Sequence, residues 1–285
     1  MLSLHTNAAS LFTKSNLNAN QSGLSTSMTR LGTGLRINSA MDDAAGLQIA
    51  TRLDAQSRGM GAAMKNAQNG ISLLQTGEGA LNEVSNILLR MKDLATEGAN
   101  ATTTTADKAA MQAEYDALGA EIGNIMKNTR FGGTEVLDKT AGTLGKAAIK
   151  FQIGASAAEV MDADLKTTLG DVDTDVGAAT TMYGAAPAAG TEIGAAATIT
   201  KLDKAIASVS KSRGEMGAAA TRLQSVYSNL GNVNNNTQIA KGRIMDTDYA
   251  SESASMTSKQ MLMQAGTSML KQSSSMSQLA MSLLQ

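Results

Sequence analysis

Apolar residues recur at intervals of seven near both ends of this chain of 285 residues. An interval of seven places side chains on one face of an α-helix, so each end is predicted to form a helix with a continuous apolar stripe. Chain ends that pack against nothing usually fray. We therefore expect both helices to be buried, against each other and against neighbouring copies of the chain. The stripe residues are Leu17, Leu24, Met28, Leu31 and Leu35 near the N-terminus and Met256, Leu262, Met263, Met269, Leu270, Met276 and Leu283 near the C-terminus.

Two longer series of apolar residues at intervals of seven lie between these ends. The first series predicts a helix of roughly 65 Å, and the second predicts its antiparallel partner. A third helix is expected between Met111 and Thr129, where apolar residues are spaced by three and four. Helices this long are typical of bundles and filaments. The first series is Leu53, Met60, Ala67, Leu74, Leu81, Leu88 and Ala95, and the second is Leu202, Val209, Met216, Leu223 and Leu230.

The middle of the chain has a different character. Ile149, Phe151 and Ile153 alternate with polar neighbours, which predicts a half-buried strand that pairs with residues 134–137. Residues 167–198 are mostly Ala, Gly and Thr with no persistent period, which predicts a surface loop. The predicted fold class is therefore mainly α, with long helical-bundle rods, coiled-coil terminal helices and a small β-hairpin region.

Composition excludes several classes of function. The net charge is −1 with no basic stripe, so nucleic acid is not an expected partner. Cysteine is absent, which excludes disulfides, thiolate catalysis and cysteine-ligated metal. No run of about 18 apolar residues occurs, so no membrane insertion is expected, and the first residues lack the pattern of a cleavable signal peptide.

No motif supports enzymatic activity, a metal site or a cofactor. The neighbouring carboxylates of Asp42 and Asp43 have no further ligand at metal-binding spacing, and they suit the N-terminal end of the helix that follows. The chain contains one histidine, no HExxH motif and no serine beside a plausible base. We expect no catalytic, metal or cofactor-binding residues.

Several segments resemble the conserved regions of bacterial flagellins, over roughly residues 1–165 and 198–285. The short middle and residues 1–7 are similar to lateral-type members of that family. Met41 is a departure, because the family commonly has Lys there. The matching segments are Leu35–Gly46, Asn69–Ser72, Glu78–Glu83, Phe151–Gly154 and Met281–Leu284.

This resemblance implies an extracellular structural subunit of the flagellar filament, exported unfolded through the flagellar type III apparatus. Its implied partners are copies of itself, the flagellar cap, the hook-filament junction proteins and an export chaperone on the C-terminal segment. It also implies a division into an inner helical domain, a rod domain and a variable surface segment. Residues 1–38 and 241–285 form the inner domain, 39–165 and 198–240 the rod domain, and 166–197 the surface segment.

The resemblance also implies a contact with the animal innate receptor Toll-like receptor 5. In flagellins that this receptor recognises, an Arg, a Leu and a Glu form the contact, and Arg90, Leu94 and Glu114 stand at the matching positions. Leu89 stands where strongly recognised members commonly have Gln. From the residues alone, Arg90 and Leu94 share one face of a helix, which also fits an ordinary solvated face with Leu94 partly in the seam.

Two other readings remain open at this point. A hook-filament junction protein shares the flagellin fold, but is usually longer and departs from the pattern of residues 42–46. A monomeric secreted helical adhesin or translocator is a rival of another class, in which the terminal stripes pack only within one chain. Abundance separates a flagellin, with thousands of copies per filament, from a junction protein that forms a single ring, and elongation of filament seeds separates a flagellin from the adhesin or translocator.

Overall fold

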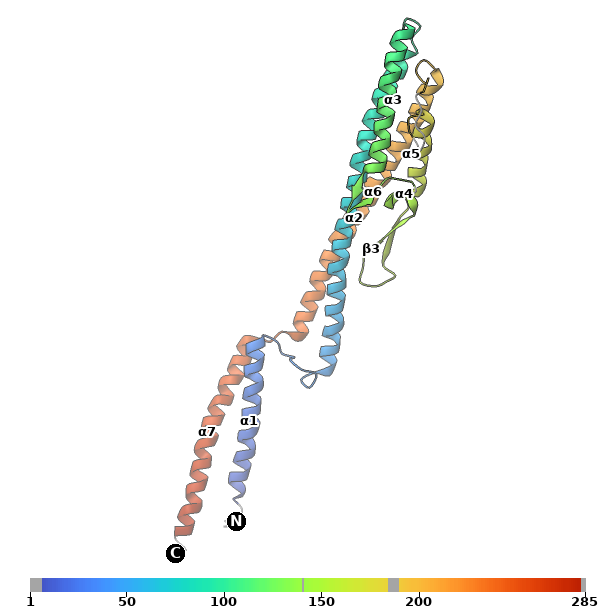
Figure 1. Ribbon diagram of the computed structural model, residues 1–285. Coiled ribbons are helices and arrows are strands. Elements are labelled where there is room, and N and C mark those ends of the chain that lie inside the picture. The colour runs from blue at the N-terminus through green and yellow to red at the C-terminus, as the bar shows by residue number, and fades with distance from the viewer. Residues whose placement is uncertain (1–6, 140, 184–189, 283–285) are drawn as a thin grey trace. The chain divides into compact units, whose positions relative to one another are not determined.

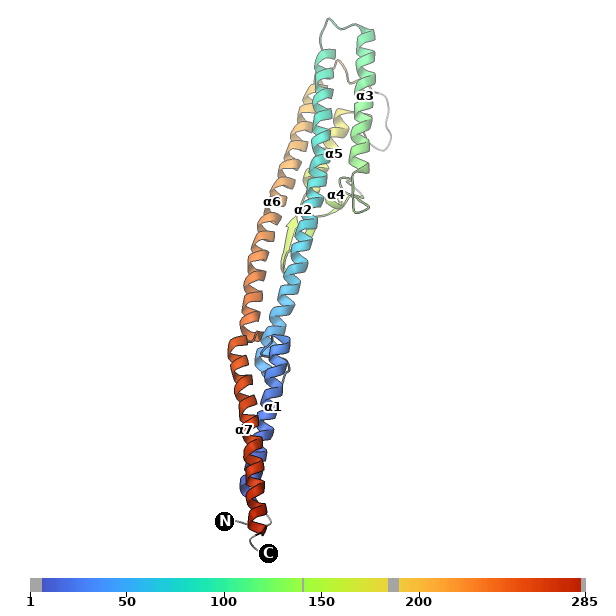
Figure 2. The ribbon, with the colours of Figure 1, turned by 90° about the vertical axis from the view of Figure 1, so that its left-hand side faces the viewer.

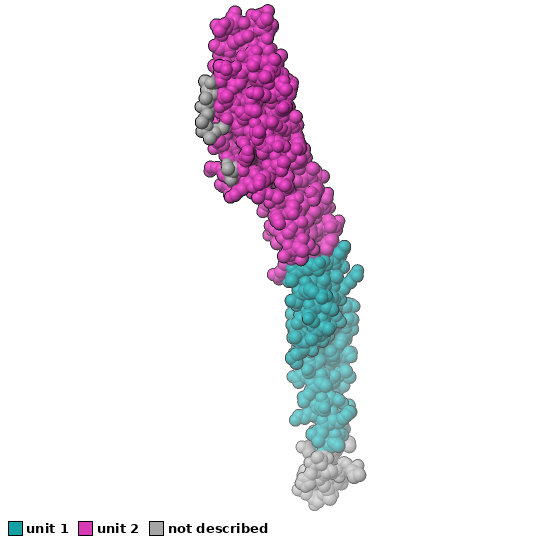
Figure 3. All heavy atoms as spheres, turned by 90° about the vertical axis from the view of Figure 1, so that its right-hand side faces the viewer, with its two compact units in different colours: residues 1–56, 235–285 teal, residues 57–234 magenta. Residues whose placement is uncertain are grey.

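The computed structural model describes residues 7–139, 141–183 and 190–282. Long helices dominate it, and two small antiparallel sheets lie between the third and fifth helices (Figure 1, Figure 2). The chain divides into two compact units, residues 1–56 with 235–285 and residues 57–234 (Figure 3). The elements are α1 (Ala8–Thr33), α2 (Ala44–Gly98), α3 (Thr105–Asn128), β1 (Arg130–Phe131), β2 (Thr134–Glu135), α4 (Thr143–Lys146), β3 (Ile149–Gln152), β4 (Val160–Ala163), α5 (Lys166–Ala179), α6 (Ala196–Met245) and α7 (Tyr249–Ser282).

In the unit of residues 57–234, α2 and α6 run antiparallel. Glu78 on α2 pairs with Arg213 on α6 at 2.8 Å, and Lys92 further along α2 pairs with the earlier Asp203 at 2.6 Å. Both predicted series line the interface: every member from Met60 to Ala95 and from Leu202 to Leu230 is buried. The prediction of two antiparallel partner helices is confirmed, because an interval of seven keeps these side chains on the facing sides.

The third helix, α3, packs on the same core through Tyr115, Ile122 and Met126. Its N-terminus is closed by a capping box, in which the Thr104 hydroxyl accepts from the Asp107 amide and the Asp107 carboxylate accepts from the Thr104 amide. This reciprocal pair satisfies two backbone donors that a helix start leaves free.

The small sheets differ from the predicted pairing. Residues 134–137 do not pair with the strand at 149–152. Instead, β1 pairs with β2 across Gly132 and Gly133, whose φ angles of 59° and 87° favour a tight hairpin turn, and β3 pairs with β4 with Phe151 opposite Met161. The prediction was wrong because each strand has a partner close by in the chain, which costs less entropy to reach.

A further correction concerns residues 166–179, which were expected to be a loop. They form α5, and Leu169, Val172 and Val176 pack in the core at spacings of three and four. This short period was hidden by the Ala, Gly and Thr residues that follow it. Residues 184–189 of the predicted loop lie outside the described part of the chain.

In the other unit, α1 and α7 lie side by side and run antiparallel (Figure 1, Figure 2). The first turns of α2 and the last turns of α6 complete this unit, and Lys241 pairs there with Asp54 at 2.5 Å. Residues 232–236 are helical, and α6 continues through them to Met245. Within the unit of residues 57–234, the Ser57 hydroxyl donates to Asn234 at 2.7 Å.

Candidate assembly surface

The predicted stripe residues divide into two groups, and the first group faces the partner helix within the chain. Leu24 is buried between α1 and α7, and its neighbours along this seam are half-buried. Leu35 is also half-buried and forms an isolated bridge with Asp246. These side chains are covered by the chain's own fold, which leaves them little area for a neighbouring copy. The half-buried seam residues are Leu17, Leu31, Met256, Met263 and Leu270.

The second group is exposed to solvent. Met28 is 53% exposed, Leu262 51% and Met269 64%. Sequence reasoning missed three further members, because Leu11, Phe12 and Met261 fall outside the interval of seven, and their apolar character was their only signal. The six residues Leu11, Phe12, Met28, Met261, Leu262 and Met269 are called the outer stripe below.

Two predicted interface residues are not placed. Leu283 and the side chain of Met276 lie outside the part of the chain that the structure describes.

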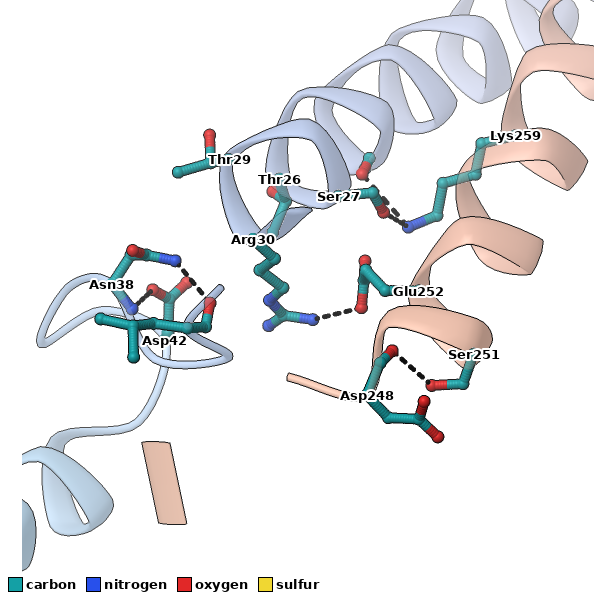
Figure 4. Close-up of polar contacts among 12 residues, drawn as sticks. Thr26, Ser27, Thr29, Arg30, Asn38, Asp42, Asp248, Ser251, Glu252 and Lys259 are labelled. Carbon is teal, nitrogen blue, oxygen red and sulfur yellow. Dashed lines mark hydrogen bonds and ion pairs between the residues drawn. The ribbon is translucent and has the colours of Figure 1, made fainter. Parts of the chain in front are cut away.

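Polar side chains bridge the two helices beside the apolar seam (Figure 4). Lys259 donates from Nζ to the Ser27 hydroxyl at 3.0 Å and to the Gly23 carbonyl at 3.1 Å. Arg30 Nη1 lies 3.6 Å from Glu252 Oε2, and both side chains are largely covered. Ser27 is fully buried, so its hydroxyl depends on these protein partners.

The loop between α1 and α2 is held by the two carboxylates that the sequence singled out. Asp42 accepts from the amides of Ser39 and Asn38, and these bonds, that of Ser39 first, hold the pKa of Asp42 below its usual value. Asp43 accepts from the Gly46 amide at 2.8 Å at the start of α2. Asp43 therefore acts at the helix end as predicted, whereas Asp42 closes the loop before it.

The three residues matched to the innate-receptor contact are only partly brought together on the surface. Arg90 donates from Nη2 and Nε to Glu114 Oε1 at 2.8 and 3.0 Å, and both side chains are about half exposed. Leu94 lies in the core at 3% exposure. The apolar neighbour that the solvent reaches is Leu89.

The described residues contain no group of three or more His, Cys, Asp or Glu placed to hold a metal ion. None of their helices combines the length and apolar character needed to cross a membrane.

Comparison with known proteins matches both ends of the chain. The model of the bacterial flagellin N-terminal helical region matches residues 4–142, and that of the C-terminal helical region matches residues 199–284. Flagellin D of Vibrio anguillarum is 32% identical over 374 aligned positions, with 99% of each chain covered. Flagellin A of the same organism is also 32% identical, with 100% of each chain covered.

The alignment with Flagellin D is longer than this chain of 285 residues, so this chain lacks segments that the relative has. A putative flagellar hook-associated protein from Vibrio parahaemolyticus shares the fold, with a TM-score of 0.54 and 17% identity over 72% of this chain and 100% of that one. The sequence matches are to flagellins, which are extracellular structural proteins of the filament, self-polymerise and are not enzymes. This chain therefore belongs to the bacterial flagellin family.

Proposed function

We propose that the outer stripe is the surface that neighbouring copies cover when this flagellin polymerises. The observation that carries the proposal is the contrast on α7 between neighbours: Leu262 and Met269 are exposed, while Met263 and Leu270 are turned to the seam. Transfer of a large apolar side chain out of water contributes about 1.5–3 kcal/mol. Six such residues supply enough to hold copies together in an open, head-to-tail array.

The wider assignment follows the predicted division of the chain. We place residues 1–38 and 241–285 in the inner layer of the filament and residues 39–165 and 198–240 in the rods around it. Residues 166–197 are the short variable segment, whose first part is anchored by α5. The stripe residues of the seam, in this assignment, shape the helix pair that carries the outer stripe.

Elongation of filament seeds tests the assembly surface. The double substitution Leu262→Gln and Met269→Gln removes apolar area without changing the seam. We expect it to lower the elongation rate at least about tenfold, measured by sedimentation of polymer after seeding. Gln260→Ala with Gln264→Ala, at exposed polar positions of the same helix, is the matched control. An elongation rate of the double variant equal to that of the natural chain would contradict the proposal.

The same two helices also suit the other flagellar partners. Cap and hook-filament junction proteins meet the subunit at the filament ends, where one side of the outer stripe has no neighbouring copy. An export chaperone would bind the C-terminal segment before α1 pairs with it, because α7 then presents both the seam and the outer stripe. Chaperone capture by the full chain, and its loss when residues 249–282 are deleted, is the expected result. Equal capture of both chains would contradict the assignment.

We infer a second contact, with Toll-like receptor 5, centred on the ion pair of Arg90 and Glu114. The pair is exposed, and Leu89 supplies apolar area beside it, whereas Leu94 supports the site from the core. Arg90→Ala with Glu114→Ala should lower receptor activation by monomer in a reporter cell. The control is Arg130→Ala with Glu135→Ala, another exposed ion pair of the same unit. Equal activation by both variants would refute the contact.

A further inference from the structure

The seam between α1 and α7 contains an apolar row that repeats every seven residues on both helices. A slide of one helix along the other by seven residues exchanges each apolar side chain for an equivalent one. The apolar row alone is therefore compatible with more than one register. Its members are Leu17, Leu24 and Leu31 on α1 and Met256, Met263 and Leu270 on α7.

A second row on α7 also has an interval of seven, but its members all differ. Glu252, Lys259, Gly266 and Ser273 are called the mixed row below. The charged members have partners on α1 that only one register provides: Arg30 for Glu252, and Ser27 with the Gly23 carbonyl for Lys259 (Figure 4).

The uncharged members of the mixed row are matched as closely. A Cβ atom at Gly266 would lie 3.2 Å from Leu17 Cδ1, so the missing side chain makes room for that leucine. Ser273 accepts a hydrogen bond from Asn7 Nδ2 at 3.0 Å on its hydroxyl. All four positions of the mixed row thus fit the same register.

A slide of seven residues in either direction breaks these matches. In one direction, Lys259 leaves Gly23 and comes beside Arg30. Two cations then face each other in a partly buried interface, which is unfavourable. In the same slide, Glu252 moves past the end of α1 at Thr33. In the other direction, Glu252 comes beside Gly23, and Arg30 loses Glu252 and lies beyond the start of α7 at Tyr249. Both slides also remove the donor from the fully buried hydroxyl of Ser27.

We propose that Ser27, Arg30, Glu252 and Lys259 select the register of the terminal helix pair, the same register that the backbone bridge of Leu35 with Asp246 favours at its end. They are positioning residues: polar groups in a helix seam exclude alternative pairings at some cost in stability. A slide of seven residues moves α7 by about 10 Å along α1. This slide would shift the outer-stripe residues of α1 relative to those of α7. A single register therefore gives every copy the same outer surface.

Engineered disulfides report the register directly, because the chain has no cysteine of its own. Leu17→Cys with Gly266→Cys reports the observed register. Leu24→Cys with Gly266→Cys reports the slide that brings Lys259 beside Arg30. Each reporter chain is co-assembled into filaments with an excess of cysteine-free chain, so that only disulfides within one chain form. The filaments are oxidised and dissolved, and the cross-linked fraction is read on a non-reducing gel.

Each reporter is compared in three backgrounds: the natural residues, the neutral variant Arg30→Gln, Glu252→Gln and Lys259→Gln, and the swapped pair Arg30→Glu with Glu252→Arg. We expect the slide reporter to cross-link at least about tenfold more in the neutral variant than in the natural background. The swapped pair keeps opposite charges at the same positions and should stay close to the natural background. Equal cross-linking of the slide reporter in the natural and neutral backgrounds would overturn the proposal.

A neutral variant that does not enter filaments still leaves a decisive measurement. Ser27→Ala removes one of the two acceptors of Lys259, the hydroxyl, without changing any charge, and the reporters are then read in that background. A rise of the slide reporter above the natural background supports the role of the mixed row. An unchanged slide reporter in the Ser27→Ala background counts against it.

Discussion

The Tyr115 hydroxyl of α3 donates a hydrogen bond of 2.7 Å to the Ala179 carbonyl at the end of α5, and both residues are buried. This bond ties α5 to the core that the long helices build. Tyr115→Phe leaves that carbonyl without its partner, which costs about 1–2 kcal/mol of unfolding free energy. Denaturant unfolding checks this, with the exposed Tyr227→Phe as control. Equal stability of the two variants would contradict the role of the bond.

The same tyrosine predicts a loss of stability at alkaline pH. Burial, and then the charges of Glu192 and Asp116, raise the pKa of Tyr115 far above its ordinary value. A raised pKa means that the folded chain holds the proton more tightly than the unfolded chain. The stabilisation is present below about pH 10 and is lost as pH rises above it. Tyr115→Phe should flatten the decline of stability above about pH 10. Part of the decline should remain, because burial also raises the pKa of Tyr183.

Adjacent leucines on α2 offer a matched test of the heptad core. Leu88 is fully buried, whereas Leu89 is 49% exposed. Leu88→Ala leaves a cavity and should cost about 2–5 kcal/mol, while Leu89→Ala should stay within about 0.5 kcal/mol of the natural chain. Thermal and denaturant unfolding of the two variants give the comparison. A similar loss from both would mean that this face of α2 is wrongly assigned.

The capping box of α3 predicts an acid-sensitive helix end. Hydrogen bonds from Thr104, its side chain first, lower the pKa of Asp107. A lowered pKa favours the folded state above the ordinary pKa of aspartate, and this contribution is lost as pH falls through the lowered value. NMR titration should find the Asp107 pKa below that of an unfolded aspartate. Thr104→Ala should raise the pKa of Asp107 toward its ordinary value. An unchanged Asp107 pKa in this variant would argue against the capping box.

Methionine oxidation should separate the outer stripe from the core. Met28, Met261 and Met269 are exposed, whereas Met91 and Met216 are fully buried. Hydrogen peroxide transfers one oxygen atom to the thioether and leaves as water, which makes an exposed apolar side chain polar. In monomer, these three residues should oxidise together with Met41, which is 96% exposed and lies outside the outer stripe, and before the buried methionines, as read by peptide mass spectrometry.

Oxidised monomer should then elongate filament seeds more slowly, and filaments should protect the same three methionines. Replacing all three by Leu should give chains that elongate normally and resist this effect of peroxide. Loss of elongation in the Leu variant at the same peroxide dose would place the damage elsewhere.

Much of the fold could be predicted because the intervals of seven are long and unbroken. The series on α2 and α6 fall in the core as expected, since packing of two long helices demands that pattern over its whole length. The pattern could not decide which terminal residues face the seam and which face outward. Met263 and Met269 both fit an apolar stripe. Only the position of α1 decides that Met263 is half-buried and Met269 is exposed.

Short elements were harder to predict. The period of Leu169, Val172 and Val176 covers only two turns, too few to stand out beside a segment of Ala, Gly and Thr. Leu94 is buried more deeply than the partial burial that the sequence suggested. A helix face that mixes a long cation with an apolar residue can carry the first into solvent and the second into the core.

The pairing of α2 with α6 also sets when the chain can fold. Glu78 and Arg213 are 135 positions apart in the chain. The apolar face of α2 between Leu74 and Leu88 can therefore pack on α6 only after the last third of the polypeptide has been made. Until α6 is available, the part of that face that α6 covers has no partner, so the antiparallel pair forms late. The export as an extended thread that the flagellin resemblance implies would benefit from this delay, because a chain that folded first could not pass a narrow channel.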